Sequence, residues 1–144
     1  MSDDTRRSVS LTRLSRGRYE VTNARGGTLV VGHGGEDFTP VELLLTAIAG
    51  CSAIDVDYLT SRRAEPVRFE VSMAGDKSRS SAGNQMGGLT LTFDVTFPAD
   101  GSGDDAREML PRAVQASHDR LCTVSRTVEQ GTPIAVRIDG AAGE

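Results

Sequence analysis

The two cysteines of this sequence, Cys51 and Cys122, offer its most reactive chemistry. A thiolate attacks electrophiles such as peroxides, whereas a free cysteine packed in a protein interior is usually inert. Cys51 lies in an apolar run, where burial raises the pKa of a thiol, so a reactive thiolate there requires a cation nearby. The residues alone leave both the reactive and the packing interpretation open for each cysteine.

Other side chains bear on this chemistry. Cys122 precedes a predicted short helix, whose backbone N–H groups favour a thiolate, and Asp55 shares the helical face of Cys51 and opposes thiolate formation if it lies close. Together with His33 and His118, the cysteines leave a zinc site open, although the spacing contains no C-x-x-C pair. The common hydrolase and nucleotide-binding motifs are absent from the sequence.

A long helix must position Cys51. Thr39, Pro40 and Glu42 form a capping box with proline at the first helical position, so we expect a helix from Pro40 to about Ser61. Its first four turns are apolar on nearly every side, which predicts burial all round. Such burial suggests a central helix wrapped by sheet, from one subunit or two.

The remaining elements follow from apolar periodicity. Short strands are expected near residues 9–11, 19–21 and 29–31, and alternation predicts two further strands over 67–73 and 89–97. The connection over 74–88 is rich in Ser, Gly and Asn, and we expect a mobile hairpin loop there.

The last third of the chain is predicted to be mainly helical. Asp104 and Asp105 open a helix in which Pro111 marks a kink or a restart, and a short helix covers residues 123–130. Alternating apolar residues over 134–138 predict a final strand. The order predicts an α+β fold with a largely antiparallel sheet, in one domain over residues 1–144 with a flexible N-terminus over 1–8.

Composition excludes several classes. The 144 residues carry a net charge of −4, and 25% of them are charged, which argues against wholesale disorder and against a nucleic-acid partner. Polar residues interrupt the longest apolar run, and no apolar segment follows the N-terminus, so we expect neither a membrane span nor a secretory signal. The expected location is the cytoplasm, where thiols are normally reduced.

Two segments resemble a known family. Residues 39–56, TPVELLLTAIAGCSAIDV, resemble the cysteine helix of the OsmC/Ohr proteins, the osmotically inducible and organic-hydroperoxide-resistance proteins. Residues 117–125, SHDRLCTVS, resemble the second cysteine motif of that family. The order of elements also agrees, so the resemblance covers roughly residues 11–138.

The resemblance implies an OsmC-like fold in which antiparallel sheets wrap long central helices in an intertwined homodimer. It also implies a thiol-dependent peroxidase that reduces organic hydroperoxides in oxidative or osmotic stress defence. Cys51 would be the peroxidatic residue, and its sulfenic acid would condense with Cys122 as the resolving thiol. A dithiol reductant, lipoyl-type in the family, would reopen the disulfide, and no metal, haem or flavin is expected.

Two charged residues complete the implied site. The family lowers the thiol pKa with an arginine, for which Arg25 is the candidate, and holds that arginine with a glutamate directly after the helix-opening proline. Val41 occupies that position here and Glu42 follows it, so Glu42 is the candidate acid, although helical geometry places it opposite Cys51. This departure resembles a less characterised OsmC-like branch.

Two alternatives remain beside the peroxidase. One is a non-catalytic dimeric protein that binds small molecules or serves in stress and whose cysteines only pack. The other is a thiol enzyme that acts on a different electrophile.

Overall fold

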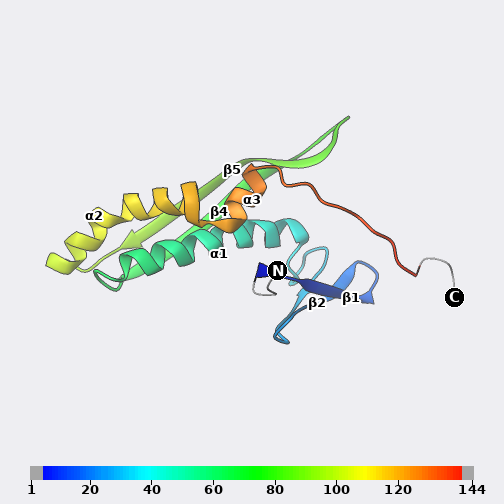
Figure 1. Ribbon diagram of the computed structural model, residues 1–144, viewed down its shortest axis with the longest axis horizontal. Helices are drawn as coiled ribbons and strands as arrows, with labels where there is room; N and C mark the ends of the chain where they lie inside the picture. Colours follow the sequence, from blue (N-terminus) through cyan, green and yellow to red (C-terminus); the bar gives the residue numbers. More distant parts are fainter. Residues whose placement is uncertain (1–4, 141–144) are drawn as a thin grey trace. The chain divides into compact units, whose positions relative to one another are not determined.

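The computed structural model describes residues 5–140 and divides into two compact units (Figure 1). One unit extends to Thr46 and the other begins at Ala47, so the boundary falls within a long helix. Of the N-terminal segment expected to be flexible, residues 1–4 lie outside the described residues.

The first unit contains a three-stranded antiparallel sheet of β1 (Val9–Ser15), β2 (Arg18–Asn23) and β3 (Thr28–Val31), in that spatial order. The three expected short strands are therefore confirmed. Asn23 shapes the turn between β2 and β3, because its side-chain oxygen accepts hydrogen bonds from the backbone N–H groups of Arg25 and Gly27. Gly26 adopts a φ of 90° in this turn, a conformation that glycine accepts without strain.

Helix α1 (Pro40–Thr60) begins at the predicted capping box. The Thr39 N–H donates to Glu42 Oε1 over 2.9 Å, and the Glu42 N–H donates to Thr39 Oγ1 over 3.2 Å. These reciprocal bonds satisfy backbone donors that the first turn of a helix leaves free. The sequence therefore identified the start of this helix correctly.

The expected burial of α1 on all sides is wrong for the single chain. Its buried residues are Ile48, Ser52, Val56 and Thr60, which share one face at a spacing of four. Ile54 and Tyr58 on another face are 55% and 69% exposed. By length and composition alone α1 is able to cross a membrane. The polar residues that interrupt it therefore do not exclude a membrane span, contrary to our expectation. A core helix of a soluble protein passes the same test.

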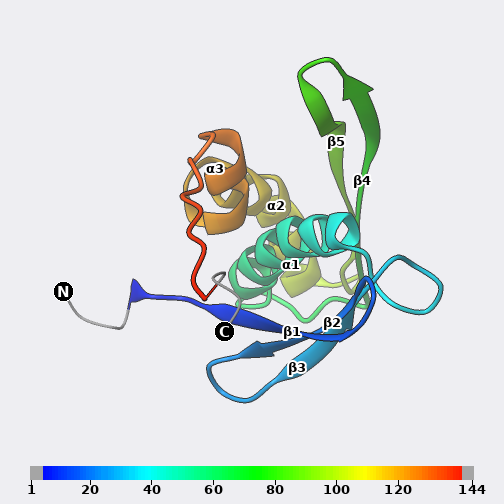
Figure 2. The ribbon, with the colours of Figure 1, turned by 90° about the vertical axis from the view of Figure 1, so that its right-hand side faces the viewer.

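In the second unit a long antiparallel hairpin follows α1, formed by β4 (Arg68–Ser80) and β5 (Gly83–Thr96) (Figure 2). The expected loop over 74–88 is thus wrong, because most of it is paired strand. Backbone pairing outweighs the weak strand propensity of its polar residues. The register shifts at Gly75, where a Cβ atom would lie 2.6 Å from a Leu89 methyl carbon and 3.0 Å from the Gly87 carbonyl oxygen, so a larger residue would require these neighbours to shift.

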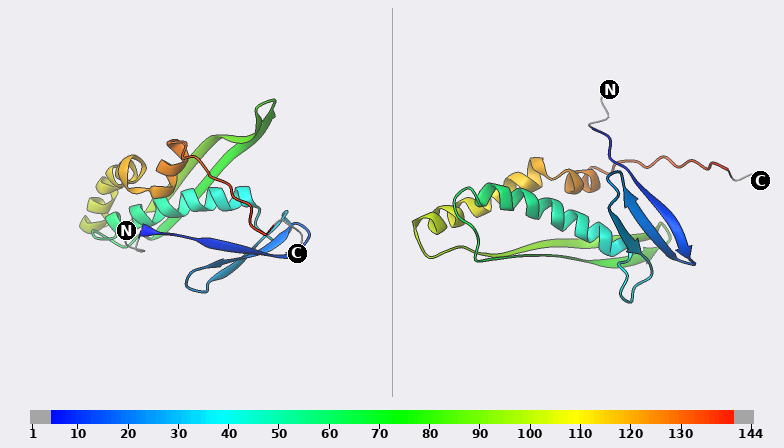
Figure 3. Two further views of the ribbon diagram at one scale, coloured as in Figure 1. Left: turned by 45° about the vertical axis from the view of Figure 1, so that its right-hand side comes forward. Right: turned by 90° about the horizontal axis from the view of Figure 1, so that it is seen from below.

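Three helical segments complete the second unit: α2 (Gly101–Ala116), the π-helical turn η2 (Ser117–Leu121) and α3 (Thr123–Glu129). Helix α2 is capped by Asp100, starts earlier than expected and continues through Pro111. The predicted short helix at 123–130 is confirmed. The part of α1 from Ala47 onward and α2 both lie on one face of the hairpin (Figure 3).

The expected final strand does not form in the described chain. Residues 133–139 have no regular secondary structure, and the side chains of Ile134, Val136 and Ile138 are 79–88% exposed. A strand requires a neighbour to pair its backbone groups, and no strand among residues 5–140 provides one here. The α+β class with antiparallel sheets is nevertheless confirmed.

Candidate thiol site

The second unit brings the two cysteines together. The sulfur atoms of Cys51 and Cys122 and a carboxylate oxygen of Asp55 all lie within 4.8 Å of one another. Cys51 and Asp55 are one turn apart on α1, and Cys122 is the residue immediately before α3. Neither cysteine is in a disulfide. An S–S bond is about 2.05 Å long, so a disulfide between them would require both side chains to move.

Cys122 is completely buried and caps helix α3. Its sulfur accepts a hydrogen bond from the Ser125 N–H over 3.4 Å and lies 3.2 Å from the Ser125 hydroxyl. Burial alone would raise the pKa of the Cys122 thiol, but its hydrogen bonds with the Ser125 and Ser52 hydroxyls, the Ser125 N–H and the Cys51 thiol lower it. These hydrogen bonds favour negative charge on the Cys122 sulfur.

Cys51 is half-buried and has the opposite electrostatic environment. Burial raises the pKa of the Cys51 thiol, and the neighbouring Cys122 and Asp55 raise it further, against a hydrogen bond from the Val124 backbone. None of these neighbours in the second unit is a cation. The cation that a Cys51 thiolate requires must therefore come from outside this group of residues.

Asp55 is held in place by the residue that begins η2. The buried Ser117 hydroxyl donates to Asp55 Oδ2 over 2.9 Å. This hydrogen bond joins α1 to the segment that carries Cys122, and it leaves the second carboxylate oxygen of Asp55 available.

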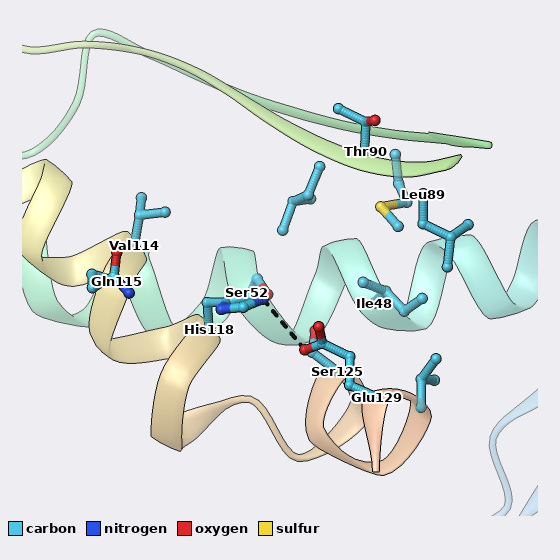
Figure 4. Close-up of a pocket in the computed structure, with 12 residues that line it drawn as sticks. Ile48, Ser52, Leu89, Thr90, Val114, Gln115, His118, Ser125 and Glu129 are labelled. Atoms are coloured by element: carbon cyan, nitrogen blue, oxygen red, sulfur yellow. Dashed lines mark ion pairs between the residues drawn. The ribbon is translucent and has the colours of Figure 1, made fainter. Parts of the chain in front are cut away.

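A pocket of about 430 Å³ lies beside the cysteine pair, between the helices and the hairpin (Figure 4). Its lining is mainly apolar and comprises Ile48, Ser52, Met73, Leu89, Thr90, Leu91, Val114, Gln115, His118, Ser125, Val128 and Glu129. Neither cysteine lines it, but Ser52 and Ser125 do, and both hydroxyls hydrogen-bond to the Cys122 sulfur. Ser52 and Ser125 thus connect the wall of the pocket to the Cys122 sulfur.

The histidines do not join the cysteine cluster. His118 is exposed, and its ring nitrogens lie 3.3 Å from carboxylate oxygens of Asp119 and Glu129, the latter pair marked in Figure 4. His33 belongs to the first unit. A zinc site of two cysteines and these two histidines therefore has no support in the described residues, where Asp55 is the third potential ligand.

Arg25 and Glu42 also belong to the first unit. Arg25 is exposed in the turn between β2 and β3, and Glu42 is used by the capping box. Their roles at the thiol site stay predictions.

Sequence reasoning missed the three serines around the cluster, Ser52, Ser117 and Ser125. For Ser125 a signal was present: it stands three residues after Cys122, the spacing at which the side chain before a helix accepts from a backbone N–H. Ser52 and Ser117 carry no such signal, since only the tertiary structure places them at the site.

The fold and the site together define a class: an α+β chain with a cysteine on a long helix and a second cysteine at a later helix start. The family model described as OsmC-like protein matches residues 32–137. The chain therefore belongs to the OsmC-like protein family.

Known proteins are similar to this chain in sequence or in fold. An uncharacterized protein of Mycobacterium tuberculosis, Rv2923c, is 29% identical over 84% of this chain and 88% of its own length. An OsmC-like protein of unknown function from Vibrio cholerae matches with a TM-score of 0.71 at 12% identity, over 87% of this chain and 94% of its own. The organic hydroperoxide resistance protein OhrB of Bacillus subtilis matches with a TM-score of 0.53 at 15% identity, over 85% and 90%. These two structures bear on the fold alone.

Proposed function

We propose that this protein is a thiol-dependent peroxidase that reduces organic hydroperoxides in cytoplasmic stress defence. The observation that carries the proposal is the approach of the Cys51 and Cys122 sulfurs to within 4.8 Å. Membership of the OsmC-like family supports it, as does the fold shared with a protein named for organic hydroperoxide resistance.

The first step assigns attack to Cys51. Its thiolate attacks the terminal oxygen of the hydroperoxide, the O–O bond breaks, and the alkoxide takes a proton and leaves as an alcohol. The sulfur is oxidised to a sulfenic acid and the peroxide is reduced by two electrons. The half-exposed position of Cys51 supports this role, because a peroxide must reach the attacking sulfur.

The second step assigns resolution to Cys122. Its sulfur attacks the sulfenic sulfur of Cys51, a disulfide forms, and the hydroxyl group leaves with a proton as water. A buried thiol suits this role, because the step is intramolecular and needs no solvent access. An external dithiol then reduces the disulfide by exchange, and its own two sulfurs are oxidised.

We assign Arg25 as the cation that a Cys51 thiolate requires. We also propose that a second copy of the chain covers the exposed apolar residues of α1. A homodimer would cover Ile54 and Tyr58 of α1, and it would offer the extended residues 133–139 a strand to pair with. Burial of this apolar surface would stabilise the association.

The test is a consumption assay with the purified full-length chain, cumene hydroperoxide and a dihydrolipoyl reductant, in the presence of a chelator. We expect turnover that Cys51→Ser abolishes and that Cys122→Ser stops after one equivalent of peroxide. Asp57→Asn, an exposed change on the same helix, is the matched control and should retain activity. Absence of turnover, or turnover that survives Cys51→Ser, would reject this proposal and leave the non-catalytic protein and the thiol enzyme with a different electrophile as the alternatives.

A further inference from the structure

The cluster of Cys51, Asp55 and Cys122 has the composition of a metal site. It presents two sulfurs and one carboxylate oxygen, the ligand types that Zn²⁺ binds, from three side chains whose donor atoms all lie within 4.8 Å of one another. Among residues 5–140 it is the one cluster of at least three Cys, His, Asp or Glu side chains whose ligand atoms lie close enough together to hold a metal ion.

The dimensions agree with tetrahedral coordination after small movements. With Zn–S near 2.3 Å and Zn–O near 2.0 Å, the ligand atoms of a tetrahedral site lie roughly 3.5 to 3.8 Å apart. The observed limit of 4.8 Å requires shifts on the order of 1 Å, which rotation about side-chain bonds provides.

The residues behind the ligands are already hydrogen-bonded as a metal site requires. Ser117 fixes Asp55 through one carboxylate oxygen at 2.9 Å and leaves the other oxygen for an ion. Ser125 fixes the Cys122 sulfur through its backbone N–H. Such second contacts orient the ligands and reduce the conformational entropy lost on binding.

The charge and exposure of the cluster also favour a cation. When a cation binds, both thiols lose their protons, so two thiolates and a carboxylate bring three negative charges together. A divalent ion compensates this repulsion. Cys51 and Asp55 are only half-buried, which leaves a route for the ion and room for a water molecule as fourth ligand.

We propose that the reduced protein binds one thiophilic divalent cation of the Zn²⁺ type through the Cys51 sulfur, the Cys122 sulfur and one carboxylate oxygen of Asp55. Metal and disulfide exclude each other, because both use the same two sulfurs. Zinc would thus protect the reduced pair and inhibit attack on a peroxide, and oxidation to the disulfide would release the ion. The inference goes beyond the peroxidase proposal and does not depend on turnover.

The experiment uses Co²⁺ as a spectroscopic probe on the reduced, metal-free, full-length protein. We expect one equivalent to bind with intense sulfur-to-cobalt charge-transfer absorption and the visible bands of tetrahedral Co²⁺, and Zn²⁺ to displace it. Cys51→Ser and Cys122→Ser should each weaken binding by at least about 100-fold, and Asp55→Ala by at least about tenfold. Asp57→Asn, exposed on the same helix, is the matched control and should bind like the parent protein.

Three outcomes would overturn the site: no sulfur-to-cobalt absorption, binding unchanged in Cys122→Ser, or binding unchanged in Asp55→Ala. If a cysteine variant does not fold, the parent protein oxidised to the disulfide replaces it and should lose Co²⁺ binding. Peroxidase turnover is measured separately with a chelator present. Turnover without Co²⁺ binding therefore rejects only the metal site, and Co²⁺ binding without turnover rejects only the peroxidase.

Discussion

Ser117 and Asp55, which lie in separate cysteine-containing segments, are joined by a hydrogen bond of 2.9 Å between the serine hydroxyl and a carboxylate oxygen. The bond ties α1, which carries Cys51, to the turn that leads into Cys122. Its donor is buried and its acceptor is charged, a combination that makes a hydrogen bond stronger than average.

We therefore expect Ser117→Ala to lower the free energy of unfolding by about 1–3 kcal/mol, because it leaves a partly buried carboxylate without its donor. The measurement is urea unfolding of the reduced protein at one fixed protein concentration. Ser78→Ala is the control, since Ser78 is exposed and its side chain makes a long bond of 3.3 Å. Equal stability of the two variants would mean that this bond does not hold the segments together.

Substitutions in the capping box distinguish the two roles considered for Glu42, one in the helix cap and one at the thiol site. Thr39→Ala removes the side chain that accepts from the helix start and should cost about 1 kcal/mol of stability. Glu42→Gln should have little effect on stability, because glutamine also serves in a capping box. If Glu42→Gln lowers peroxide turnover while unfolding stays unchanged, the carboxylate has a role at the thiol site in addition to its structural one.

The thiol pair predicts a specific covalent product. Treatment with one equivalent of cumene hydroperoxide should join Cys51 to Cys122, and peptide mass spectrometry under non-reducing conditions detects the link. In Cys122→Ser the reaction should stop at the sulfenic acid of Cys51, which a dimedone adduct reports. Intermolecular links, or an adduct on Cys122 in Cys51→Ser at the parent rate, would contradict the assigned roles.

The exposed apolar face of α1 predicts a dimer. Light scattering should give twice the chain mass of 15.3 kDa, and Tyr58→Lys should weaken association because it places a charge on the face that the partner covers. Glu108→Lys, an exposed charge change on α2, is the control. A stable monomer of the parent protein would remove the explanation for this apolar surface.

An ion pair in the first unit predicts an acid-dependent stability. The Arg18 guanidinium lies 2.8 Å from Asp37, and it lowers the pKa of that carboxyl. A depressed folded-state pKa contributes stability that is present above the unfolded pKa, near 3.9, and is lost as the pH falls through the folded value. Asp37→Asn should therefore flatten the acid limb of a plot of stability against pH below about pH 4. An unchanged acid limb would show that the pair is fully screened by solvent.

Features set by neighbouring residues were predicted accurately. The capping box at Thr39 and Glu42 and the short helix after Cys122 are set by residues within four positions of one another, so they can be read without the fold. The alternation of apolar and polar residues over 67–73 and 89–97 likewise predicted strands, and these segments fall largely within β4 and β5.

Features that depend on distant partners could not be read in this way. The hairpin over 74–88 is ordered by pairing, not by propensity, and the residues expected to form a last strand have no strand beside them in the described chain. The approach of Asp55 to both sulfurs and the hydrogen bond from Ser117 exist only because α1 packs beside residues that follow more than sixty positions later. Sequence identified the cysteines, and tertiary structure supplied their neighbours.

The sulfur of Cys122 has both a structural and a chemical role in this chain. Cys122 accepts the backbone N–H of Ser125 and so begins α3, and it is also one half of the thiol pair. Disulfide formation changes the charge and geometry of this acceptor, so we expect oxidation at Cys122 to alter the first turn of that helix. The amide proton of Ser125 is therefore a built-in reporter of the chemical state of the pair, and its NMR resonance shifts with each change at the sulfur, even where no substrate or ion contacts α3.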